Sequence, residues 1–167
     1  DANKRLLKKN GKMIPESGTI KISLLGNDKE IFKTTSVANV NGFDLSEFNS
    51  ISQSKFLHIL KKKPTLLSNN EDAFTINLYN KDNLVKEEKI IELKVNKEGL
   101  CLGIIQWMKI QLYKDIEYEN SPGEYLDSPT GWPTPIHLFD KPVSLKKGDV
   151  LKIRASLGTD NLWFFKE

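Results

Sequence analysis

Residues 128–153 read SPTGWPTPIHLFDKPVSLKKGDVLKI, and this stretch determines the expected fold. A turn rich in proline and glycine comes first, followed by the apolar run Ile136–Phe139. The polar sequence Lys146–Asp149 then separates this run from a second one, Val150–Ala155. Short apolar runs bounded by Gly, Pro and Asp are typical of β-strands joined by tight turns. The stretch therefore predicts two consecutive antiparallel strands.

The same pattern extends over most of the chain. Further runs rich in β-branched and aromatic residues are Thr19–Leu25, Phe56–Leu60, Phe74–Tyr79, Ile90–Val95, Leu100–Leu112 and Leu162–Phe165. Many short strands separated by turn residues favour a barrel or a sandwich. We therefore expect a mostly β domain over residues 12–167, a distorted barrel or sandwich of about ten strands.

Two segments depart from the β pattern. Asn3–Lys9 is typical of the end of a helix, which Asn10-Gly11 would stop because glycine tolerates a left-handed conformation. Near residues 31–56 we expect a short helical arm, capped by Asp44 or Ser46. The apolar residues spaced for one face of that helix are Phe43, Leu45, Phe48 and Ile51.

Composition excludes several classes of function. The 167 residues carry 25 basic and 22 acidic side chains, a net charge of +3. The sequence therefore lacks the large excess of basic residues that is typical of nucleic-acid binding. No apolar run approaches the ~20 residues of a membrane span. With Cys101 as the single cysteine, no internal disulfide forms, and a cytoplasmic protein is expected.

The sequence contains no strong catalytic or metal-binding motif. His58 and His137 both lie in apolar runs and are interpreted as strand residues, and Cys101 as a buried, unreactive thiol. The acidic residues between Lys114 and Pro129 are interpreted as a solvated turn. We expect no catalytic residue and no metal site here. Trp132 is different, because a loop indole can stack on a planar guanidinium.

Four segments, in this order, carry a family resemblance. They are DANKRLLKKNGKMIP (residues 1–15), NGFDLS (41–46), LCLGIIQWMKIQL (100–112) and PTGWPTPIHLFDKPVSLKKGDVL (129–151). Together they resemble the C-terminal β-barrel domain of the protein arginine methyltransferases, which binds substrate and contributes to dimerisation. The first segment is similar to the family's junction between the methyl-donor domain and the barrel, and the last to its Thr-His-Trp loop.

The resemblance implies roles for individual residues. Those placed at the methyl acceptor are Thr130, Gly131 and Trp132. Those placed in a dimerisation arm are Phe43, Asp44, Leu45 and Phe48. Gly131 stands where the family has histidine, so the acceptor, protein or small molecule, is left open.

The resemblance also implies what this chain would not do alone. S-adenosylmethionine would be bound by an α/β domain upstream in the same polypeptide, and residues 1–11 would end the helix that links it. The barrel by itself is then expected to be inactive, and the intact protein to form a homodimer.

Two other functions compete with this one. A stand-alone β-sandwich that binds carbohydrate or peptide could use Trp132, Tyr118 and Tyr125 as a stacking surface. An oligonucleotide-binding barrel would need aromatic and basic residues interleaved on its strands. Trp107–Lys109 is the one weak candidate, and the 22 acidic residues oppose it.

Overall fold

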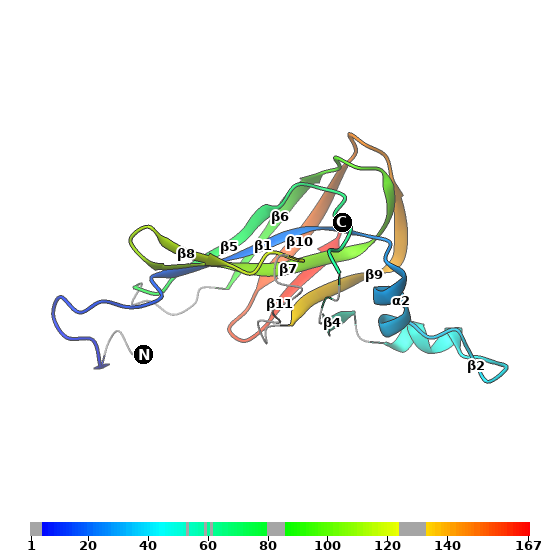
Figure 1. Cartoon of the computed structure of the whole chain (residues 1–167), viewed down its shortest axis with the longest axis horizontal. Helices are drawn as coiled ribbons and strands as arrows, with labels where there is room; N and C mark the ends of the chain where they lie inside the picture. Colours follow the sequence, from blue (N-terminus) through cyan, green and yellow to red (C-terminus); the bar gives the residue numbers. More distant parts are fainter. Residues whose placement is uncertain (1–4, 53, 59, 61, 80–85, 124–132) are drawn as a thin grey trace.

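The computed structural model describes residues 5–52, 54–58, 60, 62–79, 86–123 and 133–167 (Figure 1). Its elements in chain order are β1 Ser17–Gly26, α2 Lys29–Thr35, β2 Asn39–Val40, β3 Phe43–Asp44, the 3-10 helix η1 Ser46–Ile51, β4 Lys55–His58, β5 Glu71–Asn77, β6 Glu87–Lys94, β7 Gly99–Tyr113, β8 Ile116–Glu119, β9 Thr134–Leu145, β10 Val150–Leu157 and β11 Leu162–Lys166. The prediction of a mostly β fold is confirmed.

The strands form two main sheets and one small hairpin, and every pairing is antiparallel. The larger sheet has the order β4-β9-β7-β1-β5, with β8 also paired to β7, and the smaller has the order β11-β10-β6. Within the described residues no hydrogen-bonded ladder joins the two sheets, so the fold is sandwich-like and the barrel is not closed.

The long strand β7 is buried on both faces over residues 101–107 because an apolar cluster covers each face, and its alternation changes phase near its start. A register shift against β9 falls between Cys101 and Gly103. Cys101 and Ile104 consequently lie in one apolar cluster, while Leu102 and Ile105 lie in the other. A β-bulge has this effect because one extra residue moves the following side chains to the opposite face.

Two apolar clusters stabilise the fold. The larger lies between the sheets, and its most enclosed side chains include Ile22, Leu24, Phe74, Leu93 and Ile153. The smaller lies on the other face of the larger sheet and includes Ile31 of α2 with Ile105 and Ile136. Each such side chain contributes roughly 1.5–3 kcal/mol when it leaves water. Ile31 thus holds α2 against the sheet.

The expected arm is present, but most of it is not helical. Asn41 and Gly42 have φ angles of 52° and 88°, and they form the turn of the β2–β3 hairpin. An Asn-Gly pair is the strongest short sequence signal for such a turn, and it places Phe43 and Asp44 in a strand. Within the described part of the predicted range 31–56, helical structure is limited to η1 and to the last five residues of α2, Lys29–Thr35. The N-cap of η1 is Leu45, without a side-chain cap, although Asp44 Oδ1 accepts a hydrogen bond from Ser46 N at 2.9 Å.

The predicted N-terminal helix end lies partly outside the described residues, which begin at Arg5. Asn10, with φ 67°, takes the left-handed conformation that we expected of Gly11. Gly11 N donates to the Lys8 carbonyl at 2.8 Å. The left-handed residue therefore lies one position earlier than predicted.

Helix α2 was not predicted, and Asp28 explains how so short a helix begins. Its Oδ1 accepts hydrogen bonds from Glu30 N at 2.9 Å and Ile31 N at 3.4 Å. Its Oδ2 lies 3.3 Å from Lys62 Nζ. Burial raises the pKa of Asp28, but these hydrogen bonds and Lys62 outweigh it, and the pKa falls below 3.8.

We expect Asp28→Ala to lower the free energy of unfolding by about 1–2 kcal/mol, because two helix N–H groups lose their acceptor. Asp28→Asn is the matched control, since it keeps the acceptor oxygen and removes only the charge facing Lys62. Urea unfolding at pH 7 measures both. A loss for Asn as large as that for Ala would contradict the capping role.

Candidate functional site

The predicted acceptor-binding residues Thr130, Gly131 and Trp132 lie outside the described residues. The structure does describe both segments from which their loop departs. One is Asn120–Gly123, after β8, and the other is Pro133–Thr134, where β9 begins. These two segments flank residues 124–132 in the chain, and they are the described borders of the candidate site.

The first segment is fixed to β7. Asn120 Oδ1 accepts from Met108 N at 2.8 Å, and Asn120 N donates to the Met108 carbonyl at 3.1 Å. Gly123, with φ 82°, packs so closely on the chain that an added Cβ would lie 2.7 Å from Lys63 Cα. Any side chain here would meet Lys63 as well as an unfavourable φ. This end of the loop is therefore held between β7 and residue 63.

Glu119 provides a further contact at the same end. Its Oε1 accepts from Trp107 Nε1 at 2.7 Å and from Ser121 Oγ at 3.1 Å. Glu117 pairs with Lys109 at 2.8 Å across the β7–β8 ladder. The interpretation of this acidic stretch as a solvated turn was wrong for residues 116–119. Those carboxylates have partners on β7, and the backbone between them forms β8.

The second segment is fixed to β4. Thr134 and Ile136 of β9 pair with His58 and Phe56 of β4, and Thr134 is buried. Cα positions of facing strands lie about 5 Å apart, so β4 forms one side of this end of the loop. Of the alternative stacking surface, Trp132 and Tyr125 lie outside the described residues, and Tyr118 is half-buried in β8.

His137 is the most enclosed ionisable side chain near the site. Its exposed fraction is 2%, and Nε2 lies 3.0 Å from Gln106 Oε1. Its ring meets Phe164 edge to face, 4.9 Å between centroids. Burial, and secondarily the charge of Lys55, lower its pKa from 6.5 to about 3. His137 is thus a neutral strand residue at pH 7, and Nδ1 has no partner among the described residues.

Cys101 was expected to be buried and unreactive, and the structure describes it as fully buried. Burial raises the pKa of its thiol to about 11, so almost none of it is the nucleophilic thiolate at pH 7. Among the described residues, no three acidic, histidine or cysteine side chains are grouped to hold a metal ion. No helix in the described part of the chain is long and apolar enough to cross a membrane.

The arm, defined here as residues 37–52, projects from the sheets beyond α2 (Figure 1). Its three most exposed large apolar side chains are Phe43, 72% exposed, Phe48, 59%, and Ile51, 79%. Asn49 braces the arm, with Oδ1 2.9 Å from Val37 N and Nδ2 2.7 Å from the Val37 carbonyl. Of the residues predicted for dimerisation, Phe43, Asp44 and Phe48 are exposed, and Leu45 is half-buried.

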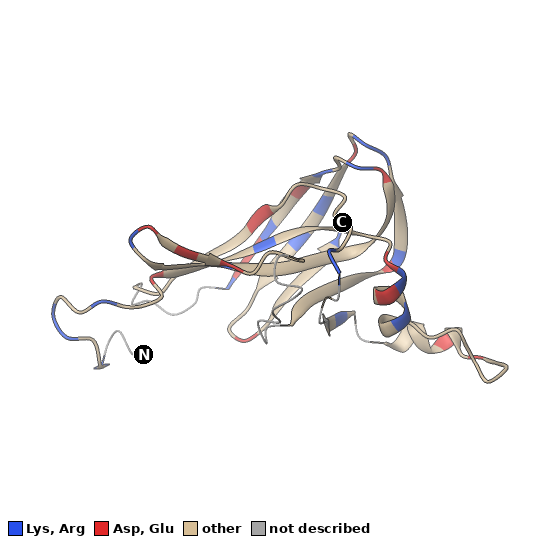
Figure 2. Ribbon diagram, viewed as in Figure 1, with Lys and Arg blue, Asp and Glu red and all other residues tan. Residues whose placement is uncertain are grey.

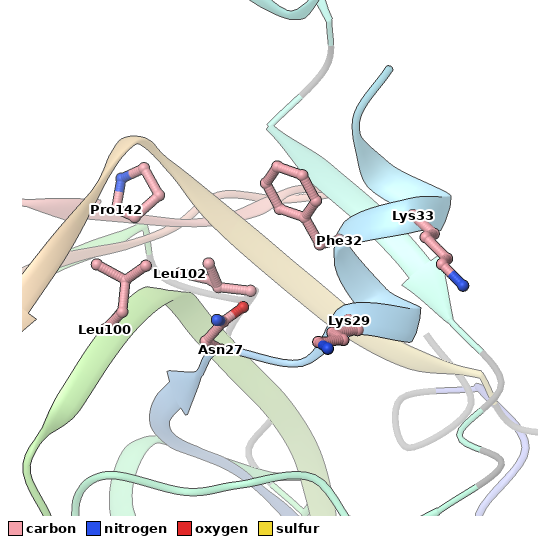
Figure 3. Close-up of a pocket in the computed structure, with 7 residues that line it drawn as sticks. All are labelled: Asn27, Lys29, Phe32, Lys33, Leu100, Leu102 and Pro142. Atoms are coloured by element: carbon pink, nitrogen blue, oxygen red, sulfur yellow. The ribbon is translucent and has the colours of Figure 1, made fainter. Parts of the chain in front are cut away.

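A groove lies beside the arm, between α2 and the bend of β9 (Figure 3). Its cavity volume is about 380 Å³, and its lining residues are Asn27, Lys29, Phe32, Lys33, Leu100, Leu102 and Pro142. A second cavity shares Phe32, Leu102 and Pro142 with it and extends to Ser52 at the base of the arm. Sequence reasoning did not find this groove, because α2 was not predicted.

Comparison with solved structures shows what this fold is similar to. No family model matches this sequence, and no curated protein matches it. The fold is similar to that of a chain in the "Trypanosoma brucei PRMT1 enzyme-prozyme heterotetrameric complex with AdoHcy", with a TM-score of 0.73 and 18% identity. The match covers 93% of this chain and 51% of that chain, so this chain spans about half the neighbour's length. At this identity the likeness establishes the fold, a PRMT1-like one.

Proposed function

We propose that this chain is the substrate-positioning and association domain of a protein related to the arginine methyltransferases, and that it is not itself catalytic. The observation that carries the proposal is the structural likeness to a PRMT1 chain over 93% of this chain. The four ordered sequence segments point to the same family independently. The remainder of the neighbour's length leaves room for a donor-binding domain, which we assign to another part of the polypeptide.

The loop with Thr130, Gly131 and Trp132 is the part that we assign to the methyl acceptor. Support comes from its two ends, which are held by Asn120 on β7 and by the β4–β9 pairing. An acceptor must be fixed relative to the donor, because misplacement by about 1 Å can lower a rate about 100-fold. Flanking segments that are fixed to the sheet meet that requirement better than unfixed ones would.

Trp132 provides a direct test in the full-length protein. We expect Trp132→Ala to lower kcat/KM for the methyl acceptor about 10- to 100-fold, because it removes the surface that positions the acceptor. Affinity for the donor is expected to stay unchanged. Phe165→Ala, which truncates an exposed aromatic residue on β11, is the control. Equal effects of the two substitutions, at equal melting temperature, would refute the assignment.

The donor provides a second test. We propose that S-adenosylmethionine binds to the other part of the polypeptide, since this sequence contains no glycine-rich turn before a helix of the kind that holds such cofactors. Isothermal titration of the 167-residue chain with S-adenosylhomocysteine should give no binding heat, and the full-length protein should give a clear one. Saturable binding to the 167-residue chain alone would overturn the assignment of donor binding to the other part of the polypeptide.

The arm is the part that we assign to association. A projecting segment with several large exposed apolar side chains is unusual on a protein that stays alone in solution, because such patches mark interaction sites. Burying Phe43, Phe48 and Ile51 against a partner would remove three large side chains from water. We therefore propose that the intact protein is a homodimer formed through this arm.

A further inference from the structure

We propose that Asn41 of the arm undergoes spontaneous deamidation, in which it becomes isoaspartate and the β2–β3 hairpin is lost. The reaction concerns the Asn41-Gly42 turn of the single chain, so it is independent of the function that we assign to the arm. Its co-reactant is water, and it needs neither a partner nor an enzyme.

The reaction begins at the backbone nitrogen of Gly42. After solvent hydroxide removes the proton of this N–H group, the nitrogen attacks Asn41 Cγ, and a succinimide ring forms. The bond between Cγ and Nδ2 breaks, and the amide nitrogen takes a proton from water and leaves as ammonia. Water then adds to the ring and breaks one of its two C–N bonds, which gives isoaspartate or aspartate at position 41. In total, an amide and a water become a carboxylic acid and an ammonia.

Gly42 leaves this nitrogen accessible. A side chain on the residue after an asparagine hinders ring closure, and glycine has none. Even a Cβ built on Gly42 would have nothing within 4 Å. Asn41 and Gly42 are both exposed, and among the described residues the Asn41 amide has no hydrogen-bond partner. The two reacting groups are therefore free to meet once the turn opens.

The hairpin that must open is small. β2 and β3 contain two residues each, and the pairs between them are Asn39 with Asp44 and Val40 with Phe43. Val40 is 43% exposed and Phe43 72%, so pairing buries little apolar surface. The N–H group of Gly42 donates to Asn39 Oδ1 at 3.0 Å. A two-stranded hairpin without a core is marginally stable in water, so its opening costs little free energy.

The other Asn-Gly pair of the chain, Asn10-Gly11, is more constrained. Gly11 N donates to the Lys8 carbonyl at 2.8 Å, and an added Cβ on Gly11 would lie 2.9 Å from that same oxygen. Two residues later, Met13 N and the Met13 carbonyl both contact Tyr79 Oη, at 3.0 and 3.3 Å. We therefore expect the turn of the arm to react faster than this second pair.

The main product changes both the backbone and the charge of the arm. Isoaspartate adds one carbon atom to the backbone, so the two-residue turn no longer fits and Val40 loses its register with Phe43. Aspartate, the other product, keeps the turn because Asp-Gly also favours it. Either carboxylate joins Asp44 and Glu47 on an arm that has no lysine or arginine (Figure 2).

Peptide mapping by mass spectrometry, after incubation of the 167-residue chain at pH 8, tests the proposal. An Asn10→Gly background removes the second Asn-Gly pair, and glycine tolerates the φ of 67° at that position. We expect isoaspartate at position 41 as the main product, formed within about tenfold of its rate in guanidinium chloride. Asn41→Gly keeps a turn-forming pair and should give no product. Stronger protection of Asn41 in the folded chain would overturn the proposal.

Asn39→Ala tests whether opening of the hairpin sets the rate. It removes the acceptor of the Gly42 N–H group, so the reaction should become about 2- to 10-fold faster, the factor expected for one hydrogen bond. Asn96→Ala is the matched control, because it removes an exposed amide that donates to Asn69 outside the arm. It should leave the rate unchanged. Equal rates for Asn39→Ala and its parent would overturn the part that we assign to the hairpin.

Nuclear Overhauser contacts between Val40 and Phe43, which face each other across the hairpin, measure its loss. They should be present in the fresh chain and absent from the isoaspartate form isolated after ageing. Asn41→Asp is the control, since it adds the same charge without the extra backbone atom, and it should retain the contacts. Retention of the contacts in the isoaspartate form would show that the hairpin survives, and would contradict the second half of the proposal.

Discussion

Replacing Gly103 with alanine is expected to lower the free energy of unfolding by at least about 3 kcal/mol, a large effect for one methyl group. A Cβ at this position would lie 2.0 Å from the His137 carbonyl oxygen and 2.8 Å from Leu138 Cα. Those atoms belong to the backbone of β9, so no side-chain rotation relieves the overlap. The two strands must separate where Gly103 faces Leu138.

The damage extends beyond this pair because β7 and β9 are central strands of the larger sheet. Ile104 and Ile105 follow directly on β7, and they are buried in different clusters. Gly18→Ala in β1 is the matched control, since nothing lies within 4 Å of its added Cβ. Thermal unfolding should show a decrease of roughly 10 °C for Gly103→Ala and a change of no more than about 3 °C for Gly18→Ala. Similar decreases in melting temperature for the two variants would show that β9 can move away from β7 at little cost in stability.

Acidification is expected to destabilise the chain well above the pH at which carboxylates titrate, and His137 is the cause. Its pKa is 6.5 when solvated and about 3 in the folded chain. Above pH 6.5 the imidazole is neutral in both states and adds no pH dependence. Below pH 6.5 the unfolded chain binds a proton that the folded chain does not. Stability is therefore lost progressively as the pH falls towards about 3.

The expected loss between pH 7 and pH 4.5 is roughly 3 kcal/mol, from about 1.4 kcal/mol per pH unit below 6.5. Asp28 contributes below this window, because its folded pKa lies under 3.8. Urea unfolding in steps of pH measures the slope. A His58→Gln background leaves His137 as the single histidine of the chain.

The comparison variant replaces both members of the buried contact, His137→Phe with Gln106→Leu. Removing both partners avoids leaving Gln106 Oε1 without the hydrogen bond that it makes at 3.0 Å. Phenylalanine also keeps an aromatic ring against Phe164. This variant should show a flat profile between pH 7 and pH 4.5. A slope equal to that of the parent would show that other groups cause the acid sensitivity.

The strands could be predicted where local pattern and burial agree. Thr19–Leu25 and Leu100–Leu112 were recognised because β-branched residues alternate or run together, and they became β1 and β7. The phase change near Gly103 could not be predicted. It depends on how β9 approaches β7, and the sequence of β7 alone does not contain that information.

Two elements were missed because tertiary contacts overrode their composition. The acidic residues of β8 favour a loop by themselves, but Lys109 and Trp107 provide partners for Glu117 and Glu119. α2 includes two threonines and only seven residues, so its propensity is weak. The Asp28 cap and the burial of Ile31 compensate. The available sequence signal for α2 was Asp28 followed three positions later by the apolar residue Ile31.

The candidate site was predictable in part. The arm was placed correctly in the chain, although the Asn41-Gly42 turn signal should have indicated a hairpin. Which apolar side chains would remain exposed could not be known, because that depends on how far the hairpin projects from the sheets. The groove forms where α2 and β9 lie on either side of Leu102. These elements are far apart in the sequence, so local pattern could not predict the groove.

The smaller sheet has a consequence for synthesis on the ribosome. β6 ends at Lys94, and its partner β10 begins only at Val150. At 5–20 residues per second the delay between them is roughly 3–11 s. During that interval Ile91 and Leu93 lack the strand that pairs with them and the Phe164 ring that packs in the same cluster. A chain stalled between β7 and β10 would therefore present an unpaired apolar strand to chaperones and proteases, even though β1, β4, β5 and β7 of the larger sheet had already been synthesised.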